Sequence, residues 1–395
     1  MCDPMQVLRL NYQPQLPQRR DWGIGCIGAG FIMRDCHLVA YKRAGFRPVA
    51  IYSKTYKHAS ALAAQFGIPR CYRHLEELLG DPEVEILDIA VPPDQQPNII
   101  RCAVRYGGKI RGILAQKPLA MSYREGRELV ELCERAGIKL GVNHNMRYDQ
   151  SVRALKDILN RGWLGEVILA TIEMRAIPHW MPWAEGLRSL STFIMSIHHL
   201  DTFRFWLGNP ERVLASTCPD PRTKFPHRDG INLYILEYPN GARACAWDDV
   251  WTGPCKEGSE GDIYIRWRVE GTDGLARGTI GWPAYPARCP STLDFTTRQF
   301  PGYWFCPRWQ DVWFPDAFVG TMAQLLSAVE NGCEPEISGR DNLDTLALCE
   351  AVLLSAETHR AVTLEEIREN PPLAIATTTQ HKARQGESKK IQIDN

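Results

Sequence analysis

A histidine and an aspartate stand three positions apart in the segment LSTFIMSIHHLDTFRFWLG (190–208), whose apolar spacing predicts a helix. Side chains three positions apart share a helix face, so His198 and Asp201 are expected to lie together. An imidazole suits proton transfer near neutral pH, and a neighbouring carboxylate can fix its tautomer. The alternative is a core histidine satisfied by Asp201. His199 lies about 100° further round the helix and is expected to be structural or cofactor-facing.

A lysine precedes a proline at the end of the apolar run IRGILAQKP (110–118), which predicts a buried strand. Lys117 contributes little to packing there, because its ammonium must be solvated or paired. The proline also biases Lys117 towards an extended conformation. Lys117 is therefore a second candidate for chemistry, and the alternative is a surface-loop lysine.

Two glycines follow the first predicted strand, GIGCIG (23–28), in the order G-A-G-F-I-M. Gly28 would allow a tight turn, and Gly30 would let the backbone approach a pyrophosphate at the N-terminus of the next helix. The following helix pattern and second strand, PVAIYS (48–53), supply the context of a dinucleotide site. Met33 stands where a third glycine is usual, which indicates a helix slightly farther from the sheet.

The residues after the second predicted strand bear on the choice between NAD and NADP. An acidic residue about 20 positions beyond the glycines would bond the ribose 2′-hydroxyl of NAD. This chain has Ser53 there, followed by Lys54, Lys57 and His58. No carboxylate repels a 2′-phosphate, and several groups could donate hydrogen bonds to one. NADP is therefore the favoured cofactor; the alternative is a solvated basic turn and NAD bound without strong discrimination.

Strand and helix patterns alternate from Trp22 to about Asn145, which predicts a parallel sheet with right-handed crossovers. Later strand-like runs at 166–176, 231–251 and 262–271 lack intervening helices and predict an antiparallel or mixed sheet. Further helices are expected at 151–162, 190–208, about 316–331 and about 341–359. The expected division is an extension (1–20), a dinucleotide-binding domain (21–148), a substrate and oligomerisation domain (149–365) and a polar tail (366–395).

The chain has 395 residues, and its 46 Lys and Arg residues balance 46 Asp and Glu residues. The length favours two domains, and the zero net charge argues against a polybasic nucleic-acid binder. No signal-peptide pattern and no run of about 18 apolar residues is present, so no membrane segment is expected. The 13 cysteines form no CxxC pair, which predicts reduced thiols in a cytoplasmic protein rather than a metal site.

Six short motifs follow one another between about residues 22 and 365: the Gly28–Gly30 turn, A-V-P-P-D (90–94), Q-K-P-L-A (116–120), N-H-N-M-R-Y (143–148), H-H-L-D (198–201) and S-G-R-D…A-V-L-L-S-A-E-T (338–358). In this order they resemble the glucose–fructose oxidoreductase, inositol dehydrogenase and rhizopine-catabolism (Gfo/Idh/MocA) family of dinucleotide-dependent sugar oxidoreductases. The resemblance implies an α/β fold with an N-terminal Rossmann doubly wound parallel sheet. It also implies a C-terminal α/β domain with a large, open, mostly antiparallel sheet whose free face commonly makes the subunit contact. The site would lie between the domains, at the carboxyl ends of the Rossmann strands.

The resemblance also implies roles for single residues. It places Lys117 beside the nicotinamide, where a cation stabilises a developing alkoxide, and gives His198 the proton relay. Family members usually have Glu before the lysine, Asp four residues before the histidine, and His shortly after the Pro–Pro turn. This chain has Gln116, Ile194 and Gln96 at those places. A neutral Gln116 should leave the pKa of Lys117 lower than a glutamate would.

The expected cofactor contacts are Gly28, Gly30, Phe31, Ile32, Ser53, Lys54, His58, Ala90, Pro92, Pro93, Gln96, Gln116, Lys117 and Asn145. The expected substrate contacts are Lys117, Arg147, Trp180, His198 and Asp201, with a tie between the domains as the alternative role of Arg147. Trp180 and Trp251 are the tryptophans expected near a ligand, because aromatic faces stack on sugar rings; most others should pack in the core or at interfaces. Trp180 lies in a Pro-flanked loop that could cover the cleft.

The function expected is reversible hydride transfer between NADP or NAD and a hydroxyl or carbonyl of a sugar, glycoside or cyclitol. A homodimer or homotetramer is expected, and no metal. One alternative is a lyase, epimerase or hydrolase that retains its dinucleotide for transient oxidation. Another is a non-catalytic dinucleotide sensor, suggested by Gln116 and Ile194.

Overall fold

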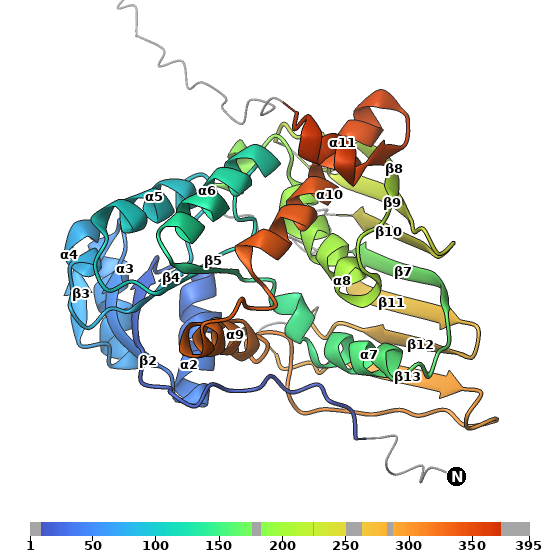
Figure 1. Ribbon diagram of the computed structural model, residues 1–395, viewed down its shortest axis with the longest axis horizontal. Coiled ribbons are helices and arrows are strands. Elements are labelled where there is room, and N and C mark those ends of the chain that lie inside the picture. Colours follow the sequence, from blue (N-terminus) through green and yellow to red (C-terminus); the bar gives the residue numbers. More distant parts are fainter. Residues whose placement is uncertain (1–8, 176–182, 224, 250–262, 283–286, 373–395) are drawn as a thin grey trace, which may run out of the picture.

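The computed structural model describes residues 9–175, 183–223, 225–249, 263–282 and 287–372. Two sheets lie side by side, one formed by the N-terminal part of the chain and one by the C-terminal part (Figure 1). The first has six strands and the second has eight. This arrangement confirms the expected α/β fold class with a parallel sheet followed by a mostly antiparallel one.

The N-terminal sheet is parallel, with the strand order β3-β2-β1-β4-β5-β6. Its strands are β1 (Gly23–Ile27), β2 (Arg47–Tyr52), β3 (Arg70–Tyr72), β4 (Ile86–Ile89), β5 (Gly112–Ala115) and β6 (Lys139–Val142). The helices are α2 (Leu38–Ala44), α3 (Tyr56–Phe66), α4 (Leu75–Leu79), α5 (Gln96–Tyr106) and α6 (Tyr123–Arg135). The order reverses between β1 and β4, which creates the crevice where doubly wound sheets bind ligands.

Local sequence signals explain these elements. Strands β1, β4 and β5 are buried throughout, as expected of apolar runs covered on both faces. Helix α3 ends at Gly67 in the left-handed conformation (φ +70°), and Ser122 caps α6 by accepting a hydrogen bond from the Glu125 amide. Strand β3 and helix α4 were not expected, because three and five residues are too short for a clear period.

The C-terminal sheet has the order β13-β12-β11-β7-β10-β9-β8-β14, and β10 pairs with β7 in parallel while the other pairs are antiparallel. Its strands are β7 (Val167–Arg175), β8 (Arg212–Cys218), β9 (Ile231–Glu237), β10 (Arg243–Asp249), β11 (Tyr264–Gly271), β12 (Gly274–Thr279), β13 (Thr292–Thr297) and β14 (Val362–Thr363). Helices α7 (Gln150–Asn160), α8 (Ile197–Leu207) and α10 (Gly339–Thr358) lie on one face (Figure 1).

Two segments join the halves. Helix α9 (Phe318–Asn331) returns to pack on β5, β6 and α2, so it covers the N-terminal sheet although it belongs to the C-terminal part of the chain. The N-terminal extension is also anchored: the Asn11 amide donates to Asp157, and Arg19 binds Glu85. The polar tail was expected to begin at residue 366, which is too early. Helix α11 (Leu364–Glu369) occupies its first residues and buries Ile367.

Candidate active site

The turn after β1 has the geometry required for a close backbone approach. Gly28 has φ +104°, and a Cβ there would lie 2.2 Å from the Ala90 carbonyl oxygen, so only glycine fits. At Gly30, by contrast, nothing in the described residues lies within 4 Å of the corresponding Cβ position. The second glycine therefore opens onto free space rather than onto packing. An open, side-chain-free turn at a strand's carboxyl end fits a pyrophosphate group.

The segment after this turn begins as a π-helical turn, η1 (Ile32–His37), and continues as α2. Met33, in the third glycine place, is fully buried in the core. Phe31 and Ile32 are partly buried at the start of the segment. The expected helix is thus present, with a wider first turn than a regular α-helix.

The groups expected at the ribose end lie directly after β2. Ser53 is partly buried, and Lys54, Lys57 and His58 are exposed on the turn and the first turn of α3. At the neighbouring strand end, the Ala90 amide donates to the Ile27 carbonyl, which holds the start of the Pro–Pro turn against β1. Pro92 is partly exposed and Pro93 is buried.

Gln96 was expected as a cofactor contact, and the structure gives its buried side chain a different role. Its Oε1 accepts from the Gln116 amide (2.6 Å), and its Nε2 donates to the carbonyls of Gln116 (2.7 Å) and Pro118 (3.0 Å). These bonds clamp the turn that carries Lys117, which precedes a cis peptide bond to Pro118. Gln96 is thus a positioning residue.

Gln116 has one side-chain atom engaged and one free. Its Oε1 accepts from the Lys117 amide (3.0 Å) and from Nδ2 of Asn143 (3.3 Å). Its Nε2 is buried and has no hydrogen-bond partner within the described residues. A buried donor without an acceptor is costly, so this amide is suited to a carbonyl or hydroxyl of a bound cofactor.

A buried network of hydrogen bonds, not expected from the sequence, holds Gln116 through Asn143. We call it the polar relay. Nδ2 of Asn143 donates to Nε2 of His37 (3.0 Å), so the His37 hydrogen lies on Nδ1 and is donated to Asp88 (2.7 Å). The Tyr41 hydroxyl donates to the same Asp88 oxygen (2.7 Å). Asp88 interrupts the apolar strand ILDI, and this break was the only sequence signal of the relay.

Lys117 reaches across the crevice to the C-terminal part of the chain. Its Nζ donates to the Ile194 carbonyl oxygen at 2.6 Å. Ile194 lies in a second π-helical turn, η4 (Thr192–Ser196), in which the Ile197 amide bonds the carbonyl of Thr192 five residues back. Burial lowers the pKa of Lys117 to about 7, because a partly dehydrated ammonium is disfavoured. Lys117 can therefore gain and lose a proton near neutral pH.

His198 follows one helical turn after Ile194 and is 5% exposed. Burial, and then the charge of Lys117, hold the pKa of His198 well below its usual value, so the ring is neutral. Its edge packs against Trp313, with ring centroids 5.5 Å apart. Nδ1 has no hydrogen-bond partner among the described residues, so the expectation that Asp201 orients His198 is wrong.

Asp201 instead belongs to a buried ion cluster. It accepts from Nε and Nη2 of Arg147 at 2.6 and 2.7 Å, and Arg147 also binds Asp341 (2.6 Å) and the Glu336 carbonyl (3.0 Å). The neighbouring Arg147 charge keeps the pKa of Asp201 below its usual value despite burial. Of the two roles considered for Arg147, the contacts match the tie between segments. The geometry does not support Asp201 and Arg147 as substrate ligands.

Other expected residues have mixed outcomes. His199 is structural, since its Nδ1 bonds Asp248 at 2.7 Å. Asn145 is buried, and its Oδ1 accepts from the indole of Trp313 (2.8 Å), a residue that no motif singled out. Trp180 and Trp251 lie outside the described residues.

In the described part of the chain, no group of three or more His, Cys, Asp or Glu side chains is placed to hold a metal ion. None of the helices described there is both long enough and apolar enough to cross a membrane.

Comparisons with known proteins bear on the family and the fold. The profile described as an oxidoreductase family with an NAD-binding Rossmann fold matches residues 22–144, and that of the GFO/IDH/MocA C-terminal domain matches residues 152–277. D-apiose dehydrogenase of Paraburkholderia graminis is 27% identical, over 89% of this chain and 92% of its own. For 1,5-anhydro-D-fructose reductase of Ensifer adhaerens the identity is 28%, over 87% and 98%.

Solved structures share the fold. An oxidoreductase from Agrobacterium radiobacter in complex with NAD+, L-tartaric acid and magnesium superposes with a TM-score of 0.74 at 24% identity, covering 88% of this chain and 99% of its own. A putative NADPH-dependent oxidoreductase from Desulfitobacterium hafniense gives a TM-score of 0.76 at 21% identity, covering 89% and 100%.

Proposed function

Because this chain belongs to the Gfo/Idh/MocA oxidoreductase family, we propose that it transfers a hydride between NAD(P) and a hydroxyl or carbonyl carbon of a sugar, glycoside or cyclitol. One observation carries the proposal. Lys117, at the carboxyl end of the parallel sheet, bonds the Ile194 carbonyl one helical turn before His198, close enough for its charge to act on that histidine, and has a pKa of about 7. The named relatives that act on D-apiose, 1,5-anhydro-D-fructose and inositol support the substrate class.

The chain's own residues would handle the proton. In oxidation, the neutral amine of Lys117 accepts the proton of the substrate hydroxyl; in reduction, its ammonium returns a proton to the carbonyl oxygen. The neutral ring of His198 would pass that proton on towards solvent. The Ile194 carbonyl orients the Lys117 nitrogen. Bound NAD(P) would supply the hydride chemistry at its nicotinamide ring.

NADP is the cofactor we favour. The support is the exposed Lys54 and His58 beyond β2 and the absence of a carboxylate in Ser53–His58. Titration of the protein with each dinucleotide should give a lower Kd for NADP. Lys54→Glu should raise the Kd for NADP at least about tenfold and change that for NAD far less, since a 2′-phosphate would meet a negative charge. Equal changes for both dinucleotides would refute the preference.

The test of the reaction is a spectrophotometric screen at the reduced-nicotinamide band with aldoses, anhydro sugars and inositols and both cofactors. Sugar-dependent formation of reduced cofactor supports hydride transfer. Substrate consumption without a net absorbance change would favour the lyase or epimerase alternative. Tight cofactor binding without turnover on any sugar would favour a sensor.

A homo-oligomer formed through the C-terminal sheet is also proposed. Helices α7, α8 and α10 cover one face of the C-terminal sheet (Figure 1). Leu214, Leu233 and Ile235 are 38–49% exposed, and Leu214 pairs with Ile235 across β8 and β9, so these side chains belong to the uncovered face. Apolar side chains gathered on an open sheet face are typical of a subunit contact. Ile235→Lys should give a smaller species in light scattering, whereas an unchanged mass would place the contact elsewhere.

A reducing compartment such as the cytoplasm is the location we propose. All eleven cysteines in the described residues are free, and several of them are buried. Free thiols at this density are usual where glutathione and thioredoxin keep cysteines reduced.

A further inference from the structure

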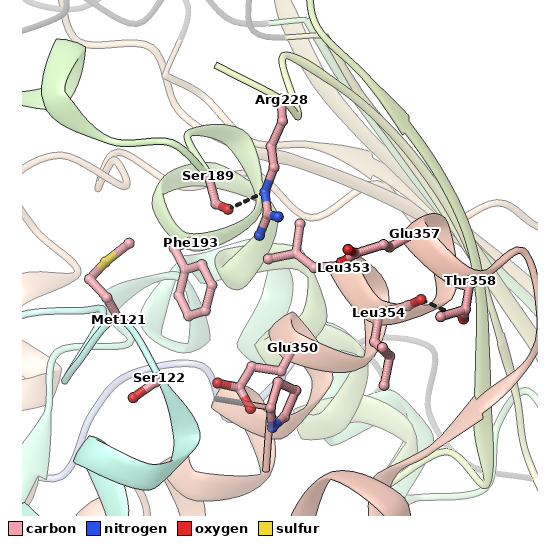
Figure 2. Close-up of a pocket in the computed structure, with 11 residues that line it drawn as sticks. Met121, Ser122, Ser189, Phe193, Arg228, Glu350, Leu353, Leu354, Glu357 and Thr358 are labelled. Atoms are coloured by element: carbon pink, nitrogen blue, oxygen red, sulfur yellow. Dashed lines mark hydrogen bonds between the residues drawn. The ribbon is translucent and has the colours of Figure 1, made fainter. Parts of the chain in front are cut away.

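A cavity lies beside helix α10 and is not lined by Lys117 or His198. It has a volume of about 260 Å³ and is bounded by side chains from five separate segments of the chain (Figure 2). These are Met121, Ser122, Ser189, Phe193, Arg228, Glu350, Leu353, Leu354, Glu357, Thr358 and Pro372. We call it the α10 cavity. It is slightly smaller than the ~300–1,000 Å³ of pockets for drug-sized ligands, so a smaller molecule would fill it.

Glu350 gives the cavity an unsatisfied acidic group. The side chain is 7% exposed, and its Oε1 accepts from the Tyr123 amide at 3.0 Å. Its Oε2 has no hydrogen-bond partner in the described part of the chain. Burial raises the pKa of Glu350 to about 7, so the carboxyl is partly protonated at neutral pH. A group in this state can donate to or accept from a ligand hydroxyl.

Arg228 supplies the complementary charge on the opposite side (Figure 2). Its Nε donates to the Ser189 hydroxyl at 3.0 Å, and no carboxylate of the described residues lies within 4.0 Å of its guanidinium. Burial lowers the pKa of Arg228; the charges of Asp229 and then Glu357 oppose this effect only in part, and the charge of Arg188 adds to it. A partly buried guanidinium without a counter-ion favours an anion, and a carboxylate matches its fork of donors.

The wall between these two groups is apolar. Phe193 and Leu353 lie between Arg228 and Glu350, with Leu354 beside them (Figure 2). We propose that the α10 cavity binds a small organic acid whose carboxylate pairs with Arg228, whose apolar body lies on this wall, and whose hydroxyl group meets Glu350.

The cavity also adjoins η4, the turn whose Ile194 carbonyl accepts from Lys117. Phe193 directly precedes Ile194, whose carbonyl accepts from Lys117. Glu350 directly follows Cys349, whose thiol donates to the Thr192 carbonyl at 3.9 Å. A bound acid would therefore touch Phe193 of η4 and Glu350, whose neighbour Cys349 bonds the same turn. This second part of the inference rests on the proposed function: occupancy should change kcat for hydride transfer.

Calorimetric titration of the full chain tests the site without any assay of activity. The probes are 4-hydroxybenzoate, benzoate and phenol, which carry both polar groups, the carboxylate alone and the hydroxyl alone. We expect 4-hydroxybenzoate to bind most tightly, benzoate at least about tenfold more weakly, and phenol not measurably. Equal affinities, or no binding at millimolar concentrations, would overturn the proposal.

Substitutions at Arg228 and at Glu350 test the two ends of the α10 cavity separately. Arg228→Gln should abolish binding of both carboxylates, whereas Arg105→Gln, at an exposed arginine that does not line the cavity, should leave it unchanged. Glu350→Gln should weaken 4-hydroxybenzoate and leave benzoate unaffected; this comparison alone decides the matter if Arg228→Gln fails to fold. Equal weakening by the two arginine variants would show only a general charge effect and would refute the site. Binding with unchanged kcat would retain the site and reject its coupling to Lys117.

Discussion

The ammonium of Lys117 and the main-chain carbonyl of Ile194 are 77 positions apart in the sequence and are joined by a 2.6 Å hydrogen bond. The bond crosses from the parallel sheet to the first turn of the α8 segment, so it connects the two halves at the proposed reacting position. Because the acceptor is a backbone oxygen, the side chain at position 194 can be apolar without releasing the lysine. The missing aspartate is therefore compatible with a positioned lysine.

Lys117→Met should lower kcat by at least about 10²-fold, as loss of one transition-state donor does. The Kd for NADP should change little, because Gln96 still clamps the turn. Stopped-flow rates and a cofactor titration measure the two effects. Lys109→Met, at an exposed lysine, is the matched control and should keep full activity. Normal turnover of the Lys117 variant would remove this residue from the mechanism.

The rate should depend on pH in opposite ways in the two directions. Since the pKa of Lys117 is about 7, the neutral amine needed for oxidation accumulates above pH 7, and the ammonium needed for reduction accumulates below it. Oxidative kcat/KM should therefore rise with pH to a plateau above about 7, and reductive kcat/KM should fall over the same range. Plots of kcat/KM against pH, recorded for oxidation and for reduction, measure this inflection. An inflection that persists in an active Lys117→Arg variant would assign it to another group.

Asp88→Asn should destabilise the N-terminal half. The side chain accepts from both His37 and Tyr41 in a fully buried setting, so loss of one of its two acceptor oxygens should cost about 1–3 kcal/mol. Urea unfolding followed by fluorescence gives the change in free energy of unfolding. Tyr41→Phe removes only one of the two donors and should cost less. A larger loss for Tyr41→Phe would show that packing, not the relay, dominates there.

Arg147→Met should affect stability more than substrate affinity. It leaves Asp201 buried without its main counter-charge, which costs about 3–5 kcal/mol. Urea unfolding and KM measurements on the same preparation separate the two effects. Arg147→Lys should recover little, because a lysine cannot make the two-pronged contact. A raised KM with unchanged stability would restore Arg147 as a substrate ligand.

The sequence was sufficient for the glycine turn, for the N-terminal sheet except β3 and for the central strands of the C-terminal sheet, because long apolar runs and glycine spacing are local signals. Strands β8, β12, β13 and β14 were not expected. It was insufficient for the partners of polar groups. The three-residue spacing of His198 and Asp201 suggested a pair, but Arg147, distant in sequence, competes for the carboxylate as a stronger, charged donor. Trp313 and the Ile194 carbonyl carry no local signal at all, since only tertiary folding brings them to the site.

The path of α9 has a consequence for how the protein is made. Gly112 of β5 touches Leu325 and Val329 of this helix, so that side of the N-terminal sheet is sealed by residues translated long after its last strand. On the ribosome, the nucleotide-binding half must wait with an uncovered apolar surface until residue 331 has emerged. A fragment that ends at residue 148 would lack α9, so this apolar surface would stay exposed and the fragment would be prone to aggregate.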